Sequence, residues 1–359
     1  MNKKLKIAVI GVGGIAQKAH LPGYARMDNV ELVAFCDIRE ERAKEVAEKY
    51  GVKQVYTDYR DVLNIEGLDA VDICTPNYMH SVIAVAALEK GINVFCEKPD
   101  AVNVEEAQKM KAAAEKSGKT LMVMRNNRYR ATSSYLKKYI EEGKMCDIYA
   151  ARCGWVRRRG IPGRGGWFTT KEQSGGGPLI DLGVHMIDLA IWLMGNPRPV
   201  AVSGCTYNKF ANSEDLADSK EARFGDRDAN GIFDVEDLAM GFIRFDNGAC
   251  MQIEFSWASN IEKEHLFVEL RGSKAGSRFC DTEENQLKIF TEENGALTDI
   301  IPQVDDSRCV QIHEANLRHF ADVLLNGTKP MFEPQHGVDM IKILTAMYKS
   351  SQEGKEIQL

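Results

Sequence analysis

The chain carries an early apolar run that leads into glycines, LKIAVIGVGGIA at residues 5–16. The run predicts a buried strand, and Gly11, Gly13 and Ala16 form the spacing G-x-G-x-x-A at the start of a helix. The first glycine permits a tight turn, the second lets the backbone approach a pyrophosphate, and the small third residue lets helix and strand pack closely. The stretch therefore predicts a dinucleotide-binding domain.

Residues next to this turn supply further candidate contacts for the cofactor. The N–H groups of Gly14 and Ile15, at the start of the expected helix, favour a bound anion. Asp37 follows Ala16 by 21 residues and ends the next strand, where a carboxylate can bind the ribose hydroxyls. Because an acid repels a 2′-phosphate, NAD is favoured over NADP, although Arg39 nearby is compatible with NADP. A helix-capping role for Asp37 is the alternative.

Short apolar runs alternate with helix-period segments up to about residue 125. This alternation implies βαβ units and a parallel sheet, and strands that are apolar nearly throughout indicate a sheet covered on both faces. We therefore expect an α/β fold whose residues 1–125 form an N-terminal Rossmann domain with a doubly wound parallel sheet. Strands are expected at 5–11, 30–37, 54–58, 70–75, 92–99 and 120–125, and helices at 15–27, 39–50, 59–64, 80–90 and 104–117.

The pattern changes after Asn126, and residues 126–359 are expected to form an α+β domain for substrate binding and oligomerisation. Its sheet should be open and largely antiparallel, since Asp246-Asn247-Gly248 between two apolar runs is a strong hairpin signal. An uncovered sheet face favours a homodimer or homotetramer. The polar segment 208–232 is expected to be a surface insertion. Strands are expected at 148–158, 238–245, 249–257, 265–272 and 287–291, and helices at 129–142, 179–192, 314–325 and 338–350.

The composition limits the class of protein. With 359 residues, the chain suits two domains better than one. A net charge of -6, with 46 basic and 52 acidic residues, argues against a dedicated nucleic-acid binder. The first apolar run ends at glycines with no small-residue cleavage site, and the longest apolar stretch contains charged residues, so neither a signal peptide nor a membrane span is expected. Nine scattered cysteines without a CxxC pair favour a reduced, cytoplasmic protein.

Two later strands end in polar motifs at the edge where ligands of doubly wound sheets bind. One ends in Thr75-Pro76-Asn77 and the other in Glu97-Lys98-Pro99. A lysine directly after an apolar strand, followed by a proline, is an unusual place for a solvated charge. The alternative is that Glu97 and Lys98 form an exposed turn.

The segment 179–192 is apolar almost all round, which predicts a buried helix. Asp181, His185 and Asp188 are spaced i, i+4 and i+7, so they share one helix face. Ionisable groups in such a place need partners or a cavity. An Asp–His pair that faces a cleft suits acid/base catalysis, and a satisfied core pair is the alternative.

A loop rich in tryptophan, arginine and glycine precedes this helix. Trp155 offers a ring face for a sugar, and Arg157 and Arg164 can bind a carboxylate or phosphate. The loop therefore indicates a sugar, polyol or glycoside substrate, with or without an anionic group. A basic surface strand followed by flexible glycines is the alternative.

Four motifs in this order and spacing resemble the Gfo/Idh/MocA oxidoreductases, the family of glucose–fructose oxidoreductase and inositol dehydrogenase. They are GVGGIA at 11–16, TPNYMH at 75–80, CEKP at 96–99 and DLGVHMID at 181–188. The ending, from NGTKP through GVDMIKILTAMYKSSQEGKEIQL, is similar to the usual end of that family. The resemblance therefore spans essentially the whole chain.

The resemblance implies roles for individual residues. Lys98 would contact both the nicotinamide ribose and the substrate hydroxyl, His185 would be the acid/base group, and Asp181 would bind and orient substrate. Asn126, Arg128 and Tyr129 match an N-x-R-[FY] pattern found near the active site of relatives. The remaining contacts to cofactor would come from Thr75, Pro76, Asn77, His80, Glu97 and Trp167. The insertion after Asn208 departs from the family pattern.

The expected function is therefore NAD(H)-dependent transfer of hydride between nicotinamide and a secondary hydroxyl or ketone of a sugar, polyol or sugar derivative. Nicotinamide carries the hydride chemistry, and the protein orients and polarises the substrate and the cofactor. Within the family, an NAD-bound glycoside hydrolase that works by transient oxidation is one alternative. A non-catalytic dinucleotide sensor is another, although such a protein has no need for Lys98, Asp181 and His185 together.

No metal site is expected, although one segment matches a calcium loop. Residues 226–237 fit D-x-D-x-N-G-x-x-D-x-x-D, but they run into a strand pattern rather than a second helix. Motif matches outside their structural context are mostly chance. His313 and His319 are six residues apart, which does not fit short-range metal spacing, and both are expected to be ordinary helix residues.

Overall fold

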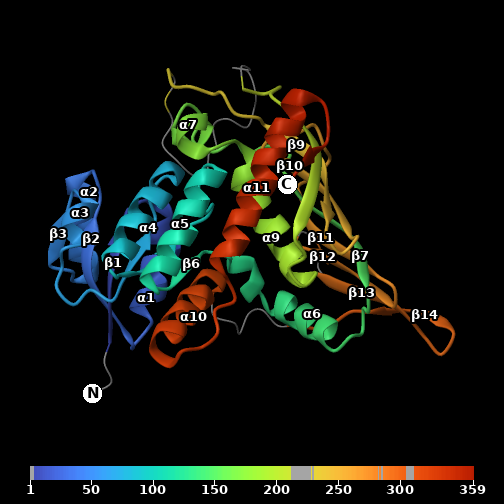
Figure 1. Ribbon diagram of the computed structural model, residues 1–359, viewed down its shortest axis with the longest axis horizontal. Coiled ribbons are helices and arrows are strands. Elements are labelled where there is room, and N and C mark those ends of the chain that lie inside the picture. The colour runs from blue at the N-terminus through green and yellow to red at the C-terminus, as the bar shows by residue number, and fades with distance from the viewer. Residues whose placement is uncertain (1–3, 212–227, 229, 282, 284–285, 305–310) are drawn as a thin grey trace. The chain divides into compact units, whose positions relative to one another are not determined.

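The computed structural model describes residues 4–211, 228, 230–281, 283, 286–304 and 311–359. The chain divides into two compact units, which are coloured along the chain in Figure 1. Unit 1 comprises Met1–Asn126 and Val310–Val338, and unit 2 comprises Asn127–Cys309 and Asp339–Leu359. The expected division into 1–125 and 126–359 thus differs from the structure in one respect, because residues 310–338 return to the first unit.

Unit 1 contains a six-stranded sheet in the order β3-β2-β1-β4-β5-β6, with all neighbours parallel. This is the doubly wound order expected for a Rossmann domain. The strands are buried on both faces, as their apolar sequences require. Their bounds are Leu5–Ile10 (β1), Val30–Cys36 (β2), Gln54–Tyr56 (β3), Ala70–Ile73 (β4), Asn93–Cys96 (β5) and Leu121–Val123 (β6).

The register of this sheet brings the carboxyl ends of its central strands to one edge. Ile10 pairs with both Cys36 and Ile73, and Ile73 in turn pairs with Cys96. Residues that follow these strands therefore start from the same edge, which is where the sequence predicts the ligand contacts.

Helices cover both faces of the sheet in unit 1. Figure 1 shows α4 and α5 side by side. Helix α5 starts at the cap residue Asn103, whose side chain accepts the N–H of Glu106, and it ends at Gly118 in the left-handed region. The helices are a π-helical segment η1 (Ala16–His20), α1 (Leu21–Ala25), α2 (Glu40–Tyr50), α3 (Tyr59–Val62), η2 (Asn77–Met79), α4 (His80–Glu89), α5 (Val104–Ser117) and α10 (Ile312–Asn326), and η3 spans Asn126–Tyr129.

Helix α10 explains why residues 310–338 belong to unit 1. Its Leu317, Phe320 and Ala321 are fully buried in the same apolar cluster as Tyr24 and Phe95. The ring of Phe320 lies 5.2 Å from the ring of Phe95 on β5. A sequence reading that assigns segments by order along the chain does not detect this return.

Unit 2 contains a nine-stranded mixed sheet in the order β14-β13-β12-β11-β7-β10-β9-β8-β15. Only the β10–β7 pair is parallel among the pairs that the structure describes, so the expected largely antiparallel sheet is confirmed. The predicted hairpin joins β9 to β10, with Gly248 at φ +85°. The strands are Ile148–Val156 (β7), Pro199–Tyr207 (β8), Leu238–Phe245 (β9), Cys250–Ser256 (β10), His265–Gly272 (β11), Ala275–Cys280 (β12), Leu287–Glu293 (β13), Ala296–Ile300 (β14) and Ile357–Gln358 (β15).

The helices of unit 2 pack on one face of this sheet, and α9 contacts β7, β10 and β11. The single helix expected over 179–192 is wrong, because the structure has α8 (Pro178–Asp181) and α9 (Gly183–Leu193) with a break at Leu182. The sequence carries one weak sign of this break, Gly183, because glycine is unfavourable inside a helix. The other helices are α6 (Ala131–Glu141), η4 (Trp167–Thr169), α7 (Lys171–Ser174) and α11 (Pro334–Glu353), the last of which begins in unit 1.

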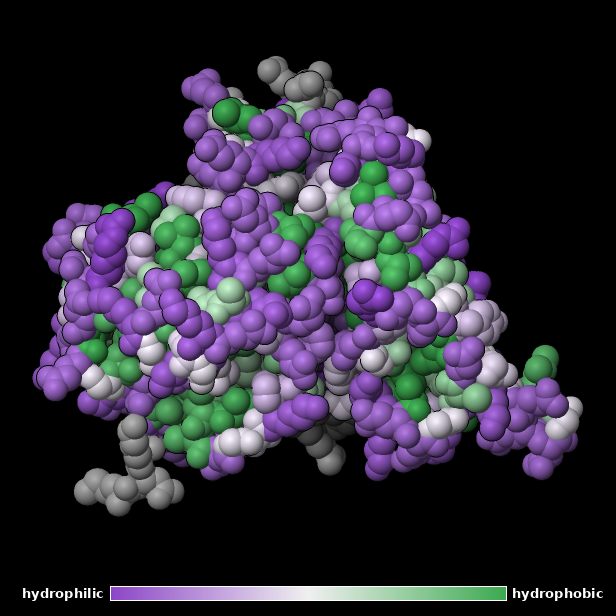
Figure 2. Space-filling view, in the orientation of Figure 1, coloured by the Kyte–Doolittle hydropathy of each residue, from purple (hydrophilic) through white to green (hydrophobic). Residues whose placement is uncertain are grey.

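The surface drawn in Figure 2 shows hydrophobic residues in small groups between hydrophilic ones. Within the described ranges, no single helix is long and apolar enough to cross a membrane. One bent pair, Lys171–Asp181 with Gly183–Leu193, meets the criteria of length and composition only when its two parts are joined.

Candidate active site

The glycine turn after β1 has the geometry that the sequence predicts for a phosphate-binding turn. Gly11 has φ +89°, and a Cβ at this position would lie 2.7 Å from the carbonyl carbon and oxygen of Cys74. Around Gly13 and Gly14, a Cβ would meet no described atom within 4 Å. Ala16 is fully buried beneath the turn. The backbone is therefore open to close approach at the two positions where a pyrophosphate needs it.

Asp37, the expected ribose ligand, is buried and already holds four donors. Its carboxylate accepts the N–H groups of Val12 and Arg39 at 3.1 and 2.9 Å. The Arg42 guanidinium donates to both carboxylate oxygens, at 3.0 and 2.7 Å. Asp37 thus ties the glycine turn to the start of α2, and ribose hydroxyls that bind its carboxylate have to displace or share Arg42.

The Thr75-Pro76-Asn77 segment lies at the same sheet edge, after β4. The Thr75 hydroxyl is buried and has no hydrogen-bond partner among the described residues. The backbone carbonyl of Thr75 lies 2.9 Å from Nε2 of His80, and the carbonyl of Pro99 lies 2.7 Å from Nδ1 of the same ring. Burial lowers the pKa of His80, so a neutral ring donates to one of these carbonyls at a time. The orphaned hydroxyl and the open glycines fit a bound dinucleotide.

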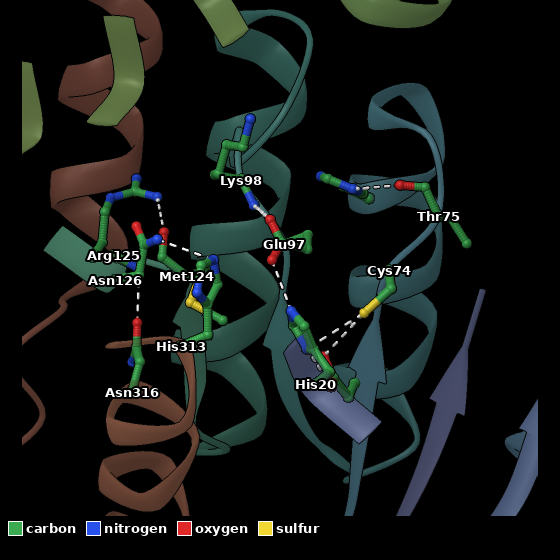
Figure 3. A network of polar contacts seen from close by, with 12 residues as sticks. His20, Cys74, Thr75, Glu97, Lys98, Met124, Arg125, Asn126, His313 and Asn316 are labelled. Atoms are coloured by element: carbon green, nitrogen blue, oxygen red, sulfur yellow. Dashed lines mark hydrogen bonds and ion pairs between the residues drawn. The ribbon is translucent and has the colours of Figure 1, made fainter. Parts of the chain in front are cut away.

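Glu97 and Lys98 follow β5, and the structure does not support the alternative of an exposed turn. Glu97 is 5% exposed and accepts the N–H of Lys98 at 3.0 Å. Its other carboxylate oxygen lies 2.7 Å from Nε2 of His20. In Figure 3 the Lys98 side chain points away from Glu97 and His20. The motif therefore has a buried acidic end and an ammonium group directed elsewhere.

The pKa of Glu97 follows from this pairing. Burial alone raises the pKa of a carboxyl, but the hydrogen bond and charge of His20 outweigh it and lower the pKa to about 2. Glu97 is therefore ionised at neutral pH.

Asn126 lies at the end of unit 1, where its amide group is 3.0 Å from Nε2 of His313 on α10 (Figure 3). Burial lowers the pKa of His313 to about 4, so the ring is neutral. Beside it, Arg125 donates to Asp100 at 2.5 Å and its backbone N–H donates to Asn316. His313 and His319 are helix residues as expected, but His313 also belongs to the polar network of this edge.

In unit 2, Asp181 and His185 lie on the two sides of the α8–α9 break. The indole N–H of the fully buried Trp257 donates to the Asp181 carboxylate at 3.0 Å. The His185 ring lies 6.1 Å from the ring of Trp155 on β7. Both side chains are partly exposed. The structure thus keeps Asp181, His185 and the candidate sugar-binding Trp155 within one unit.

Asp188 belongs to a different group, although the sequence spacing places it on the same face. It is buried and forms two hydrogen bonds with the Arg128 guanidinium, at 2.8 and 2.7 Å. Arg128 is 2% exposed and Tyr129 is also largely buried. Arg128, which was also a candidate substrate contact because it matches the N-x-R-[FY] pattern, is therefore better explained by a structural role.

The side chains of the loop 155–168, which is rich in arginine and tryptophan, contact other residues of unit 2. The Arg157 guanidinium lies 4.7 Å from the centre of the Trp155 ring, and the indole N–H of Trp155 donates to Glu264 at 2.6 Å. Arg164 contacts the carbonyl of Ala211. The Trp167 ring stacks on Phe168 with a centroid distance of 3.8 Å. These contacts favour the alternative of a basic surface strand followed by glycines over an anion-binding loop.

The calcium-loop match lies partly outside the described residues, which include 228 and 230–237 of it. Asp234 accepts the N–H of Lys171, and Asp237 accepts those of Lys209 and Phe210. Glu236 accepts the N–H groups of Gly177 and Leu179. The described acidic groups therefore bind backbone of unit 2, which argues against calcium coordination. The expected insertion 208–232 is likewise described only at 208–211, 228 and 230–232.

Sequence reasoning missed His20, Asp72, Glu236 and Trp257. Asp72 carried a usable signal, because it is a carboxylate inside the otherwise apolar strand β4 and therefore requires a buried partner. His20 gave none, since its two partners are 52 and 77 residues further along the chain.

Glu236 leads to a prediction about stability. Burial raises its pKa to about 6, although the N–H groups of Gly177 and Leu179 and the Tyr348 hydroxyl at 2.9 Å favour the charged form. A folded pKa above the unfolded value makes this group cost stability as pH rises through about 6. Tyr348→Phe removes one donor to the carboxylate, so we expect a loss of about 1–2 kcal/mol at about pH 8 and a smaller loss at about pH 5.

Urea unfolding at both pH values measures this difference. The control is Tyr149→Phe, since the Tyr149 side chain on β7 is 53% exposed. An equal loss at both pH values would contradict the role of Tyr348 in holding the carboxylate charged.

Comparisons with known proteins find two family models that match the chain. Residues 5–125 match the family model "Oxidoreductase family, NAD-binding Rossmann fold", and residues 137–359 match "Oxidoreductase family, C-terminal alpha/beta domain". The chain is 33% identical to D-glucoside 3-dehydrogenase of Escherichia coli (strain K12), over all of this chain and 98% of that protein. It is 27% identical to scyllo-inositol 2-dehydrogenase (NAD(+)) of Bacillus subtilis (strain 168), over all of this chain and 97% of the relative.

A solved structure has the same fold. GenD2 from gentamicin A biosynthesis, in complex with NAD, superposes with a TM-score of 0.80 at 25% identity and covers all of this chain and 97% of its own. The two paired models of one family together match residues 5–125 and 137–359, and the glycine turn fits the dinucleotide of that family. The chain therefore belongs to the Gfo/Idh/MocA family of NAD-binding oxidoreductases.

Proposed function

We propose that this protein oxidises a secondary ring hydroxyl of a sugar or glycoside with NAD. The observation that carries the proposal is the 33% identity over the full chain to a D-glucoside 3-dehydrogenase. The second relative is named as an inositol dehydrogenase, and inositol is a ring that carries secondary hydroxyl groups. A glucopyranoside is therefore the first substrate to test.

In this proposal three residues of the chain act on the substrate. Lys98 stabilises the negative charge that develops on the hydroxyl oxygen, which is the largest kind of catalytic contribution in a water-poor site. His185 accepts the hydroxyl proton, since its ordinary pKa is near neutrality. Asp181, oriented by the Trp257 indole, binds a substrate hydroxyl. Bound nicotinamide supplies the hydride chemistry.

The test is a substrate panel with purified protein, NAD or NADP, and NADH or NADPH absorbance as the readout. The panel contains methyl glucosides, free sugars, inositols, sugar acids and sugar phosphates, and simple aliphatic alcohols as controls. We expect NAD-dependent oxidation of glucosides and little or no activity on the alcohols. Glycoside cleavage without net NADH would indicate the hydrolase, and NAD binding without any turnover would indicate the sensor.

We further propose a homodimer or homotetramer formed through the sheet of unit 2. One face of this sheet carries half-buried apolar side chains. They are Leu238, Met240 and Phe242 on β9 and Phe267 on β11. Apolar residues on one sheet face favour association with a second copy. Light scattering after gel filtration tests this proposal, and a monomer at micromolar concentration would contradict it.

A further inference from the structure

We propose that His20, a doubly protonated imidazolium between Asp72 and Glu97, is a positioning residue that holds the Lys98 backbone in place for the reaction. The inference deepens the proposed function, because it assumes that Lys98 acts on the substrate. His20 is argued to act through Glu97 and not by contact with substrate.

The hydrogen-bond geometry supports a doubly protonated His20. Its Nδ1 lies 2.7 Å from a carboxylate oxygen of Asp72, and its Nε2 lies 2.7 Å from one of Glu97 (Figure 3). Ionised carboxylates only accept hydrogen bonds, so each ring nitrogen has to donate one. A ring that carries both N–H groups is a cation, and here it is fully buried.

The electrostatics of the cluster agree with this assignment. Burial lowers the pKa of a histidine, but the charge of Asp72 and its hydrogen bond raise the pKa of His20 well above its usual value. With Asp72 and Glu97 each at -1 and His20 at +1, the buried set carries a net charge of -1, and the nearby charge of Lys98 also lowers the pKa of Glu97. A neutral His20 would leave two buried carboxylates without a cation between them, which is costly.

Three further titratable groups beside the cluster, Cys74, Tyr24 and His313, are neutral. Burial raises the pKa of Cys74, whose sulfur lies 3.4 Å from Nδ1 of His20, to about 12. Burial also raises the pKa of Tyr24 on α1. His313 on α10 is neutral, as described above. None of these groups supplies the positive charge that the two carboxylates require.

The connection to Lys98 is short and rigid. The carboxylate of Glu97 bridges the two neighbours, because one oxygen accepts from His20 and the other accepts the N–H of Lys98 at 3.0 Å. Loss of the imidazolium would free this carboxylate to reorient or to take up a proton. Either change removes the restraint on the peptide that carries Lys98.

The local backbone gives a second, independent observation. His20 ends the π-helical segment η1, directly before α1 with Pro22 in its first turn. π-Helical turns inside helices are uncommon and are often found at functional sites. The edge of the His20 ring also packs against Phe95 of β5, with centroids 6.2 Å apart, so the ring has little freedom to move.

Nitrogen NMR of the histidine rings tests the protonation state without any substrate. The chain has seven histidines, and the His20→Gln variant assigns the His20 signal by its loss. We expect both ring nitrogens of His20 to remain protonated at about pH 9, more than two units above the ordinary pKa of about 6.5. An unprotonated ring nitrogen at that pH would overturn the proposal. A divalent metal bound at equal stoichiometry to the nearby ligand atoms of His20, Asp72 and Cys74 would overturn it as well.

The pH profile tests the positioning role. In His20→Gln the two carboxylates repel each other, which raises the pKa of one into the neutral range. We expect a new acidic limb, along which kcat/KM falls about tenfold per pH unit below the new pKa. In the double variant His20→Gln/Asp72→Asn, Glu97 stays buried without His20 but has no like charge beside it, so the new limb should shift to lower pH.

The variant Glu115→Gln is the control for an acid-to-amide change, because the Glu115 side chain on α5 is exposed and pairs with Lys111, and its profile should stay close to that of the wild type. Thermal unfolding and NADH fluorescence establish that each variant is folded and binds cofactor. A His20→Gln profile without a new limb, or a double variant whose limb lies at the same pH as in His20→Gln, would refute the positioning role. If the wild type oxidises no substrate, the proposed function fails, and the NMR measurement still decides the state of His20.

Discussion

Replacing Lys98 with Met is expected to lower turnover at least about 100-fold while NADH still binds. Lys98 is the only basic residue of the Glu97-Lys98-Pro99 motif, and its side chain points away from the buried acids beneath it (Figure 3). Methionine has a similar length and no charge, so it keeps the packing and removes the group that stabilises the developing alkoxide. The effect should therefore fall on kcat, with little change in the affinity for NADH.

The measurement is steady-state kinetics on the best substrate of the panel, together with NADH fluorescence. Lys98→Arg keeps the positive charge and changes the shape of the group that carries it. It should recover only part of the rate, because a planar guanidinium does not place its charge as an ammonium does. Lys44→Met on α2, an exposed lysine that pairs with Glu40, is the control for a lost surface charge. Turnover near that of the wild type in Lys98→Met would exclude Lys98 as a catalytic residue.

Much of unit 1 could be predicted from the sequence, because strands that are buried on both faces leave continuous apolar runs. The glycine turn and the Asp246-Asn247-Gly248 hairpin were predictable for another reason, because each of these local conformations requires a particular residue type. Strands β8 and β12 gave no comparable signal. They lie in a mixed sheet and contain serines and glycines, so their sequences do not alternate clearly.

The site was predictable only at the residues that carry motifs. Lys98 and His185 stand in recognisable segments, whereas the partners that fix their surroundings come from distant positions. The Trp257 indole binds Asp181 across 76 residues of sequence, and Arg128 binds Asp188 across 60. Pairings of this kind depend on the fold, and a single sequence contains no pattern that joins them.

The pair Arg128–Asp188 leads to the largest expected effect on stability. Both side chains are buried, 1% and 6% exposed, and the guanidinium also lies 5.9 Å from the centre of the Trp192 ring. Asp188→Ala leaves this guanidinium without its two charged acceptors in a site that water does not reach. We expect the free energy of unfolding to fall by about 3–5 kcal/mol, the usual cost of removing one partner from a buried ion pair.

Urea unfolding followed by tryptophan fluorescence measures this loss in the relevant unit, because all four tryptophans lie in unit 2. Glu356→Ala breaks the exposed pair with Arg244 and should cost less than about 1 kcal/mol. The double variant Arg128→Met/Asp188→Leu should recover most of the lost stability, because it also removes the charge that has lost Asp188 and refills the space with apolar atoms. If the double variant is as unstable as Asp188→Ala, the loss arises from packing and not from an uncompensated charge.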